Sequence, residues 1–371
     1  MDNPFTIISY ISPEYFCNRK EETKRLSDSL TNGKNIVLLS LRRMGKTGLI
    51  KHLFYTYRSK RNIHTFYLEI MNTHSAEDFV NELAKAVLGS FNSKSKRLFD
   101  NVLKLLSKFN PIITLDPITG MPSVEIKPHS TEHAKSSITE IFNYLEEQDK
   151  KIIIAIDEFQ QITNYNENGF EAFLRSHIQH LKNVNFIFSG SQQHILTAMF
   201  LSYSQPFYQS SEFLKLERIS KEDYAIFIIK KFHQTGKKIS EEIVNDLLDW
   251  ADLYTYYIQN MFNKLWYISG DIITQKDSDN TKSQLIDERD SIYQNLNNLL
   301  PKVQYKLLKA IAKNNGIDKP LSKKFRDKYD LATTSTISTA LKILKVKELI
   351  YHENNTYKIY DVFMAKWLEK N

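Results

Sequence analysis

A Gly-Lys-Thr triplet at residues 45–47 narrows the folds open to this chain more than any other segment. It follows the apolar run 36–39 and precedes a stretch with apolar residues at helical spacing. Gly45 lets the backbone turn its N–H groups towards a phosphate, Lys46 can reach phosphate oxygens, and Thr47 can hold Mg²⁺. The helix expected after the triplet adds its positive N-terminal end. The sequence therefore predicts a strand, a phosphate-binding loop and a helix, in that order.

One position of this loop departs from the usual pattern. The pattern G-x-x-x-x-G-K-[ST] begins with Gly, and this chain has Ser40 there. Ser enters the backbone regions reserved for Gly only at a cost, and a Gly-Lys-Thr triplet also occurs by chance in ordinary strand–turn–helix units. The apolar strand before the loop and the amphipathic residues Leu49, Ile50 and Leu53 after it favour phosphate binding.

A second segment, residues 151–159, is an apolar run that ends in Asp157 and Glu158. A strand buried on both faces of a parallel sheet has this pattern, and such sheets bind ligands at the carboxyl ends of their strands. Asp157 can bind Mg²⁺, and Glu158 can orient and deprotonate an attacking water, as in a Walker B motif followed by a catalytic acid. The alternative is a solvated strand end, but the loop upstream favours the catalytic interpretation.

A third expected strand covers residues 184–192 and ends in small polar residues. In many P-loop ATPases such a strand lies between the other two and offers a polar side chain to the γ-phosphate and the water. Ser191 is the candidate γ-phosphate sensor, and Ser189 is the second choice. An ordinary turn after a strand is an equally good explanation of these residues.

Taken together, these motifs resemble the archaeal-type P-loop ATPases, which belong to the MNS clade of the STAND nucleoside triphosphatases and are related to AAA+ proteins. Two positions differ from the family pattern: Asn18 stands where Gly is usual, and Thr255 where Pro is usual. The resemblance covers most of the chain from residue 3 onwards. The segments that carry it are residues 15–22, 42–47, 156–160, 188–191 and 255–259.

The resemblance implies ATP as the nucleotide, Mg²⁺ as its metal, and an N-terminal box beside the adenine. Arg19 and residues 5–10 are the corresponding candidates for base contacts, although Arg19 is equally well explained as a solvated charge at a helix start. An arginine completes charge stabilisation in such sites, and Arg175 is the candidate for this catalytic role. Further candidates for this arginine are Arg218, Arg42 and Arg43. The remaining loop residues expected to contact the nucleotide are Arg43, Met44 and Gly48.

The length of 371 residues allows two or three domains, each with a core of its own. With 42% apolar and 12% aromatic residues the chain is expected to be globular. The apolar runs are too short for a membrane span, and the N-terminal residues do not resemble a signal peptide. The single cysteine, Cys17, excludes an intrachain disulfide and suits a reducing cytoplasm.

The net charge of +7 is concentrated at one end of the chain. Residues 301–371 contain 15 Lys and Arg against 7 Asp and Glu, which leaves the first 300 residues close to neutral. A basic domain of this kind indicates nucleic acid or an acidic partner surface.

Residues 1–215 are expected to form the nucleotide-binding α/β domain, with a parallel sheet. Residues 65–70 are a further strand in it, and residues 75–91 a helix. Two short β patterns around an Asp-Pro-x-x-Gly turn predict a hairpin inserted at about residues 110–127. The hairpin could cover the site, dock a partner, or have no function.

Residues 216–288 are expected to form a helical lid, of the kind that follows the core in AAA-like ATPases. Its helices are predicted at residues 221–235, 241–250 and 254–268. The polar residues 271–287 are expected to form an exposed connection.

Residues 289–371 are expected to form a winged helix-turn-helix domain, with helices at 303–313, 322–329 and 334–347 and two strands after them. If this domain binds DNA, the outward residues of the third helix face the major groove. The interpretation we favour is a lock that packs on the ATPase domain or the lid. The outward residues are Ser335, Ser338, Thr339 and Lys342.

The function expected from these features is a slow ATP-hydrolysing molecular switch of the STAND or AAA+ type, which couples nucleotide state to domain rearrangement and partner binding. Its protein partner is not identified by the sequence, and a homo-oligomer is one expected assembly. The main alternative is an ATP-gated DNA-binding regulator that acts through the winged helix. A third, nucleotide binding without turnover, is less favoured because Lys46, Thr47, Asp157 and Glu158 are all present.

Overall fold

The computed structural model describes residues 2–7, 10–89, 112–115, 122–125 and 130–371. Two compact units divide the chain, one formed by Tyr10–Glu217 and one by Arg218–Asn371 together with the N-terminal residues. Each unit is described by itself below. The division into three domains at residues 215 and 288 stays a prediction.

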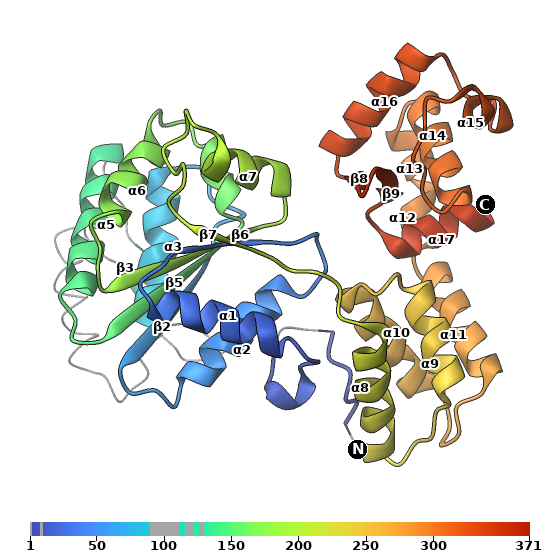
Figure 1. The fold of residues 1–371 in the computed structure, drawn as a ribbon, viewed down its shortest axis with the longest axis horizontal. Helices are drawn as coiled ribbons and strands as arrows, with labels where there is room; N and C mark the ends of the chain where they lie inside the picture. Colours follow the sequence, from blue (N-terminus) through green and yellow to red (C-terminus); the bar gives the residue numbers. More distant parts are fainter. Residues whose placement is uncertain (1, 8–9, 90–111, 116–121, 126–129) are drawn as a thin grey trace. The chain divides into compact units, whose positions relative to one another are not determined.

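A parallel five-stranded sheet forms the centre of the first unit (Figure 1). The strand order is β2-β5-β6-β1-β7, so that β6 lies between the strand of the phosphate loop and the strand of the acidic pair. The parallel sheet predicted from the sequence is confirmed. The strands are β1 (Ile36–Leu39), β2 (Ile63–Glu69), β5 (Lys151–Asp157), β6 (Val184–Gly190) and β7 (Glu212–Lys215).

Helices cover both faces of this sheet (Figure 1). Because side chains of a strand alternate between faces, Ile152 and Ile154 join one large apolar cluster with Phe79 and Phe142, which come from helices on one face. The helices α1 and α2 lie on the opposite face (Figure 1), and strand alternation assigns the odd-numbered residues of β5 to that face. The helices are α1 (Lys20–Thr31), α2 (Lys46–Tyr57), α3 (Ala76–Gly89), α5 (Thr131–Glu146), α6 (Phe170–Ile178) and α7 (Gln193–Leu201), with the 3₁₀ helices η1 (Pro13–Tyr15) and η4 (Phe159–Asn164).

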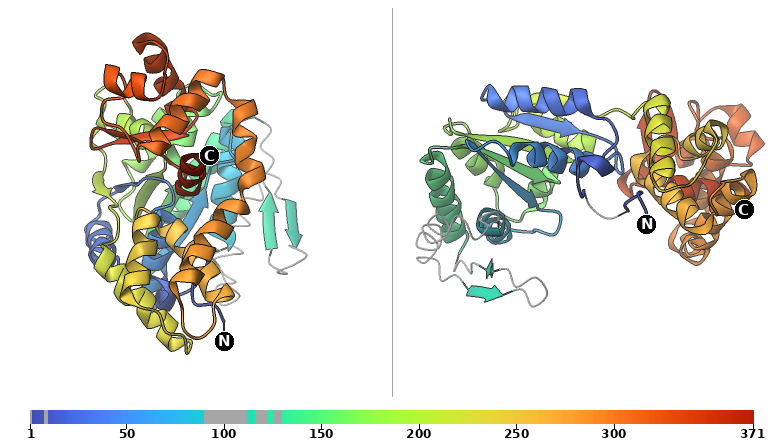
Figure 2. Two further views of the ribbon diagram at one scale, coloured as in Figure 1. Left: turned by 90° about the vertical axis from the view of Figure 1, so that its right-hand side faces the viewer. Right: turned by 90° about the horizontal axis from the view of Figure 1, so that it is seen from below.

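The predicted hairpin contains two paired strands, β3 (Ile112–Leu115) and β4 (Pro122–Glu125), which run antiparallel. They are drawn as the two arrows at the side of the sheet in Figure 2. Its turn and its flanking residues lie outside the described residues, as do the last two residues of the helix predicted to end at residue 91.

Four helices between residues 218 and 288 form the lid part of the second unit. Serine caps begin two of them, because Ser220 and Ser240 each accept a hydrogen bond from a backbone N–H of the first turn. The aromatic ring of Phe5 packs between Phe232 and Phe262, at centroid distances of 5.2 and 5.6 Å. The helices are α8 (Lys221–Gln234), α9 (Glu241–Trp250), α10 (Thr255–Ile268) and α11 (Gln275–Asp287).

The segment 271–287, expected to be an exposed connection, is mostly the helix α11, so that expectation was wrong. A capping box between Thr274 and Asp277 begins the helix. Its buried face includes Ser278 and Thr281 as well as Leu285. The sequence suggested a loop because two of these inward residues are polar, which breaks the apolar repeat at helical spacing.

The C-terminal part of the second unit has the order of a winged helix, and the helix–helix–helix–wing arrangement is confirmed. Its wing is the antiparallel pair β8 (Ile350–Glu353) and β9 (Thr356–Ile359). Asn354 and Asn355 join the two strands with φ of 48° and 61°, values that Asn tolerates better than most residues. The helices are α12 (Asp290–Gln294), α13 (Leu296–Leu299), α14 (Lys302–Lys313), α15 (Lys323–Lys328), α16 (Thr334–Val346) and α17 (Val362–Lys370).

Within this unit the wing and α17 contact the lid helices. The hydroxyl of the lid residue Tyr254 donates to the hydroxyl of Tyr351 on β8, at 2.7 Å. Arg218 bonds Glu353 of the wing at 3.1 Å and the carbonyl oxygen of Asp252 at 3.0 Å. The winged helix is therefore joined to the lid by a buried pair of tyrosines and by partly exposed charged contacts.

Candidate functional site

The phosphate loop lies between the end of β1 and the start of α2. Gly45 precedes the first residue of α2 and has φ of 88°, a conformation that favours Gly. Arg43, two residues earlier, has φ of 66°. Ser40 is not among the residues with positive φ, so the substitution of the usual Gly carries no strain. The backbone conformation of a phosphate-binding loop is thus compatible with this sequence.

Asp157 accepts hydrogen bonds through both of its carboxylate oxygens. Its Oδ2 accepts from Thr47 Oγ1 at 2.9 Å and from the Tyr67 hydroxyl at 2.7 Å. Its Oδ1 accepts from Ser189 Oγ at 2.6 Å and lies 3.2 Å from Lys46 Nζ. Burial alone would raise the pKa of Asp157, but the Lys46 ammonium and these hydrogen bonds outweigh it and lower that pKa. Asp157 is therefore ionised at neutral pH.

Glu158 follows Asp157 in the left-handed backbone region, with φ of 57°. Its Oε2 accepts from Gln160 Nε2 at 2.6 Å, and from the backbone N and Oγ of Ser191 at 3.0 and 2.9 Å. Burial opposes ionisation, yet the Lys46 charge and the hydrogen bonds from Gln160 and Ser191 lower the pKa of Glu158. A carboxylate in this state can accept a proton.

Lys46 lies between the two carboxylates and is 8% exposed. Its Nζ is 3.2 Å from Asp157 Oδ1 and 3.4 Å from Glu158 Oε1. The ammonium therefore lies between the phosphate loop and the end of β5, where it can bind an anionic ligand.

The predicted residues of the three strand ends come together as the sequence indicated. Ser191 contacts Glu158 directly, and its Oγ also accepts from Arg42 Nε at 3.3 Å. Ser189 contacts Asp157 instead, which places the two serines on different carboxylates. Of the two sensor candidates, Ser191 is the one beside the candidate base.

Arg19 is buried, not a solvated charge at a helix start: it is 4% exposed. Its guanidinium donates to the carbonyl oxygen of Met44 in the loop at 3.4 Å and to that of Glu217 at 2.6 Å, and it pairs with Glu22 at 2.7 Å. Asn18 precedes it with φ of 50°, which explains why Asn can replace the usual Gly. Arg19 thus stabilises the phosphate loop through the carbonyl oxygen of Met44.

The N-terminal candidates for base contacts fall in different places. Phe5 is buried among the lid aromatics, and residues 8 and 9 lie outside the described residues. The Tyr10 hydroxyl is 3.0 Å from His52 Nδ1, and the His52 ring stacks on Phe16 with centroids 4.3 Å apart. Phe16 also approaches Gly48, where an added Cβ would lie 3.5 Å from its ring.

The candidate arginines are separated from one another. Arg175 lies on α6, on the face of the sheet opposite α2, and its Nε is buried with no hydrogen-bond partner among the described residues (Figure 1). Arg218 is engaged in the contact between the lid and the wing. Of these candidates, Arg42 is the one shown bonded to a residue of the strand ends.

Two residues of the site, Tyr67 and Gln160, were not predicted. Tyr67 is on β2, beside β5, and its hydroxyl pKa is raised by burial and by Asp157, so it stays protonated and donates. Its position relative to Phe66 and Leu68 could have indicated this role, since alternation puts Tyr67 on the face that carries Asp157. The register between β2 and β5 that brings them together has no signal in the sequence.

The side chains present fit a nucleotide and Mg²⁺. Mg²⁺ prefers oxygen ligands and is held in proteins by one or two carboxylates together with substrate phosphates. Thr47 Oγ1 and Asp157 Oδ2, 2.9 Å apart, form such an oxygen pair. When bound, Mg²⁺ would supply charge neutralisation for the phosphate groups. Lys46 and the N-terminus of α2 would bind the phosphates themselves.

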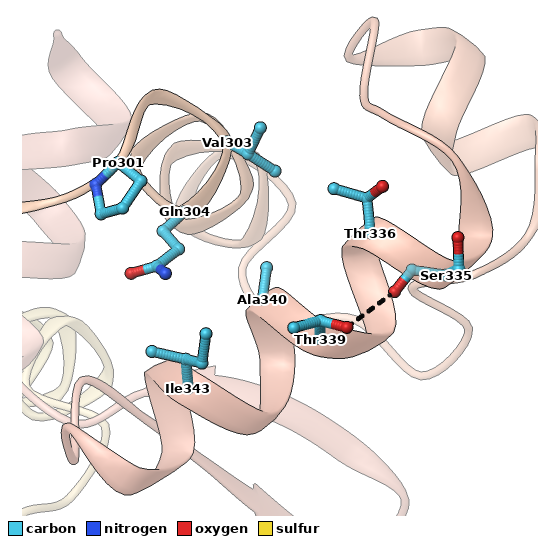
Figure 3. A pocket seen from close by; sticks show the side chains of 8 residues that line it. All are labelled: Pro301, Val303, Gln304, Ser335, Thr336, Thr339, Ala340 and Ile343. Carbon is cyan, nitrogen blue, oxygen red and sulfur yellow. Dashed lines mark hydrogen bonds between the residues drawn. The ribbon is translucent and has the colours of Figure 1, made fainter.

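A second surface of interest lies on the winged helix. A hollow of about 380 Å³ separates the start of α14 from the outer face of α16 (Figure 3). Its lining mixes apolar groups with hydroxyls, and Thr339 donates to the carbonyl oxygen of Ser335 at 3.1 Å. The residues that line it are Pro301, Val303, Gln304, Ser335, Thr336, Thr339, Ala340 and Ile343.

Two family matches account for most of the chain. Residues 16–261 match an ATPase domain found predominantly in Archaea, and residues 291–370 match a probable winged helix domain. The chain belongs to this ATPase family. The membership agrees with the sequence resemblance and with the arrangement of Lys46, Thr47, Asp157 and Glu158 at the strand ends.

Individual proteins resemble this chain in sequence over part of its length and in fold over nearly all of it. An uncharacterised ATP-binding protein of Methanocaldococcus jannaschii is 26% identical over 169 residues, which are 43% of this chain and 46% of that protein. The chain spans about half the length of this curated relative. The Walker-type ATPase of Pyrococcus abyssi superposes with a TM-score of 0.70 at 20% identity, covering 98% of this chain and 99% of the other. The Aeropyrum pernix ORC1 protein, in a structure with DNA, superposes with a TM-score of 0.55 at 11% identity, covering 100% and 96%.

Among the helices that the structure describes, none is long and apolar enough to cross a membrane.

Proposed function

We propose that this ATPase-family protein binds and slowly hydrolyses ATP with Mg²⁺ as a molecular switch of the STAND type. The observation that supports this most is the arrangement around Lys46, with Asp157 Oδ1 at 3.2 Å, Glu158 Oε1 at 3.4 Å and Thr47 Oγ1 bonded to Asp157. Lys46 binds the phosphates, Thr47 and Asp157 hold Mg²⁺, and Glu158 takes a proton from the attacking water. Ser191 senses the γ-phosphate.

In this proposal, loop residues and Arg19 complete the nucleotide site. Arg43, Met44, Gly45 and Gly48 surround the phosphates and the start of α2. Arg19 donates to the carbonyl oxygen of Met44, so nucleotide binding in the loop can change the contacts of Arg19. An arginine of the same or a neighbouring subunit adds positive charge at the γ-phosphate.

Arg175 remains the candidate for this added charge. Its place on α6, on the sheet face opposite α2 (Figure 1), fits a role in a neighbouring subunit better than a role at the phosphate loop of its own chain. The proposal therefore includes a homo-oligomer. A single cysteine in 371 residues suits the cytoplasm as the site of this cycle.

The winged helix takes part in the switch through the lid. Tyr254 and Tyr351 share a buried hydrogen bond, and the ring of Phe363 on α17 packs 4.7 Å from that of Tyr257. Because these contacts join the two parts, a movement of the lid carries the winged helix with it. An unidentified protein partner would respond to that movement.

The test of the enzymatic part is hydrolysis of Mg-ATP by the wild type and by Glu158→Gln. The amide keeps the size of Glu158 but accepts no proton, so ATP binding should persist while turnover falls by about 10²–10⁴-fold. Glu69→Gln is the matched control, because Glu69 ends the neighbouring strand opposite Asp157 and is exposed. Equal turnover in Glu158→Gln and wild type would contradict the assignment of the base.

A second candidate function is ATP-gated DNA binding through α16. The inner face of α16 is buried through Ile337, Leu341 and Leu344, whereas Ser335, Thr339 and Lys342 are exposed. An exposed polar row on the third helix of a winged helix, in a region with an excess of basic residues, supports this candidate. A measured dependence of duplex binding on salt concentration would test it.

A further inference from the structure

Three hydrogen-bond donors converge on one carboxylate oxygen of Glu158. Its Oε2 accepts from Gln160 Nε2 at 2.6 Å, from the Ser191 backbone N at 3.0 Å and from Ser191 Oγ at 2.9 Å. The other oxygen, Oε1, lies 3.4 Å from Lys46 Nζ. A carboxylate oxygen has two lone pairs, so Oε2 has no capacity left to accept a further proton. Oε1 is the oxygen of this carboxylate that can do so.

The position of Gln160 allows this contact but leaves its other polar atom buried without a hydrogen-bond partner in the described part of the chain. It is 4% exposed and lies in the first turn of η4. An ionised carboxylate only accepts hydrogen bonds, so the amide must turn Nε2 towards Glu158. Oε1 of Gln160 is then buried with no hydrogen-bond partner in the described part of the chain. A buried polar atom without a partner destabilises the fold, and the contact made by Nε2 must offset this.

Gly190, at the end of β6, makes room for the same amide. An ideal Cβ at Gly190 would lie 1.9 Å from Oε1 of Gln160 and 3.0 Å from its Cδ. Any side chain at residue 190 would therefore displace Gln160 from its place against Glu158. The end of β6 supplies two features of this arrangement, the space at Gly190 and the donors of Ser191.

We propose that Gln160 is a positioning residue that holds Oε2 of Glu158 against the end of β6, so that Oε1 receives the proton of the attacking water. This inference rests on the proposed function, in which Glu158 is the base. As the phosphates of ATP attract Lys46, Oε1 becomes free while Oε2 stays fixed. The water oxygen bonds the γ-phosphorus as its proton passes to Oε1, and the bond to the β–γ bridging oxygen breaks, with its electron pair leaving on ADP. The proton then passes to solvent.

Gln160 and Ser191 differ in how they hold Oε2 of Glu158. Ser191 Oγ also accepts from Arg42 Nε at 3.3 Å, so its orientation depends on a residue of the phosphate loop. Gln160 is two residues from Glu158 in the same turn and moves with it. Gln160 therefore keeps its hold on Oε2 while the loop changes its contacts.

Two substitutions of Gln160 test this inference in the full-length protein. Gln160→Met removes the donor and keeps the length of the side chain, and Gln160→Glu removes the donor and keeps a polar group. Both should lower kcat by roughly ten-fold or more, because a misplaced base loses its near-attack geometry. The affinity for an ATP analogue, measured by fluorescence, should stay unchanged and shows that the variants are folded.

A split between kcat and KM separates positioning from a merely structural role. Loss of the Gln160 donor should lower kcat and leave the KM for Mg-ATP unchanged, because the hydrogen bond from Gln160 Nε2 goes to Glu158, which acts in the chemical step. Gln160→Glu should show the same split. Gln161→Met is the matched control, since Gln161 donates to the carbonyl oxygen of Thr73 at 2.8 Å and not to Glu158.

The possible outcomes distinguish this inference from the proposed function. A wild-type kcat in both Gln160 variants, or a rise in KM that accounts for the whole loss of activity, would overturn the inference, while loss of turnover in Glu158→Gln would leave the proposed function standing. If the wild type hydrolyses no Mg-ATP, both fail. If Gln160→Met does not fold, Gln160→Glu decides.

Discussion

The buried hydroxyl of Tyr254 donates a hydrogen bond of 2.7 Å to the hydroxyl of Tyr351, which joins the lid to the wing. The guanidinium of Arg218 lies 4.7 Å from the Tyr254 ring centroid and bonds Glu353. Lys358 of the wing pairs with Asp252 at 3.2 Å. The contact thus combines an aromatic pair with alternating charges, and it makes the lid and the winged helix one compact unit.

A double-mutant cycle should detect the coupling between these two tyrosines. Tyr254→Phe and Tyr351→Phe each remove one hydroxyl and leave its partner buried, so each should lower the free energy of unfolding by about 1–2 kcal/mol. The double variant should lose less than the sum of the two, because no unpaired hydroxyl remains. Urea unfolding of the four proteins gives the values, and strict additivity would contradict a hydrogen bond between them.

Substitution of the loop lysine should remove most of the affinity for ATP. Lys46→Ala deletes a charge-assisted contact worth about 1.5–3 kcal/mol, which raises Kd by at least about ten-fold. Calorimetry with Mg-ATP measures the change, with Lys24→Ala as the control, since Lys24 is an exposed residue of α1. Equal affinity in Lys46→Ala and wild type would reject the nucleotide site.

The same variant should change how stability depends on pH. The folded-state pKa values of Asp157 and Glu158 lie below the ordinary values of 3.8 and 4.5. Groups with depressed pKa values stabilise the fold above their unfolded pKa, and this is lost as the pH falls through the folded pKa. In Lys46→Ala the cation that lowers both values is absent, so the free energy of unfolding should fall less on acidification. Urea unfolding at a series of pH values measures this dependence, with wild type and Lys24→Ala as comparisons. Identical slopes of the free energy of unfolding against pH in Lys46→Ala and wild type would contradict the prediction.

The winged helix offers a test of DNA binding in the intact protein. Lys342 is exposed on α16, and Lys342→Ala should weaken duplex binding and reduce the salt slope by about one unit, the loss expected for one phosphate contact. Lys366→Ala on α17, where Lys366 pairs with Glu369 at 3.2 Å, is the control. Absence of any salt-dependent binding by the wild type would favour the lock, in which the domain acts only on the lid and the ATPase domain.

The chain motifs predicted the parts of the site that are set by local sequence. Lys46, Thr47, Asp157 and Glu158 were found because a loop and two strand ends carry them in fixed order. Tyr67 and Gln160 were not found. Their contacts depend on the register between strands and on one turn geometry, which depend on packing across the sheet.

Contacts that depend on packing also explain the other differences between the sequence predictions and the structure. α11 was missed because Ser278 and Thr281 are buried without being apolar. Arg19 looked like a surface charge because its acceptors are backbone carbonyl oxygens, which no sequence pattern marks. The departures at Ser40 and Asn18 looked costly, but Ser40 avoids positive φ and Asn18 tolerates it.

Arg19 bonds the carbonyl oxygen of Glu217, and the next residue, Arg218, bonds Asp252 and Glu353. Glu217 is therefore held within the first unit and Arg218 within the second, so each unit fixes its own end of the chain at the peptide bond that joins them.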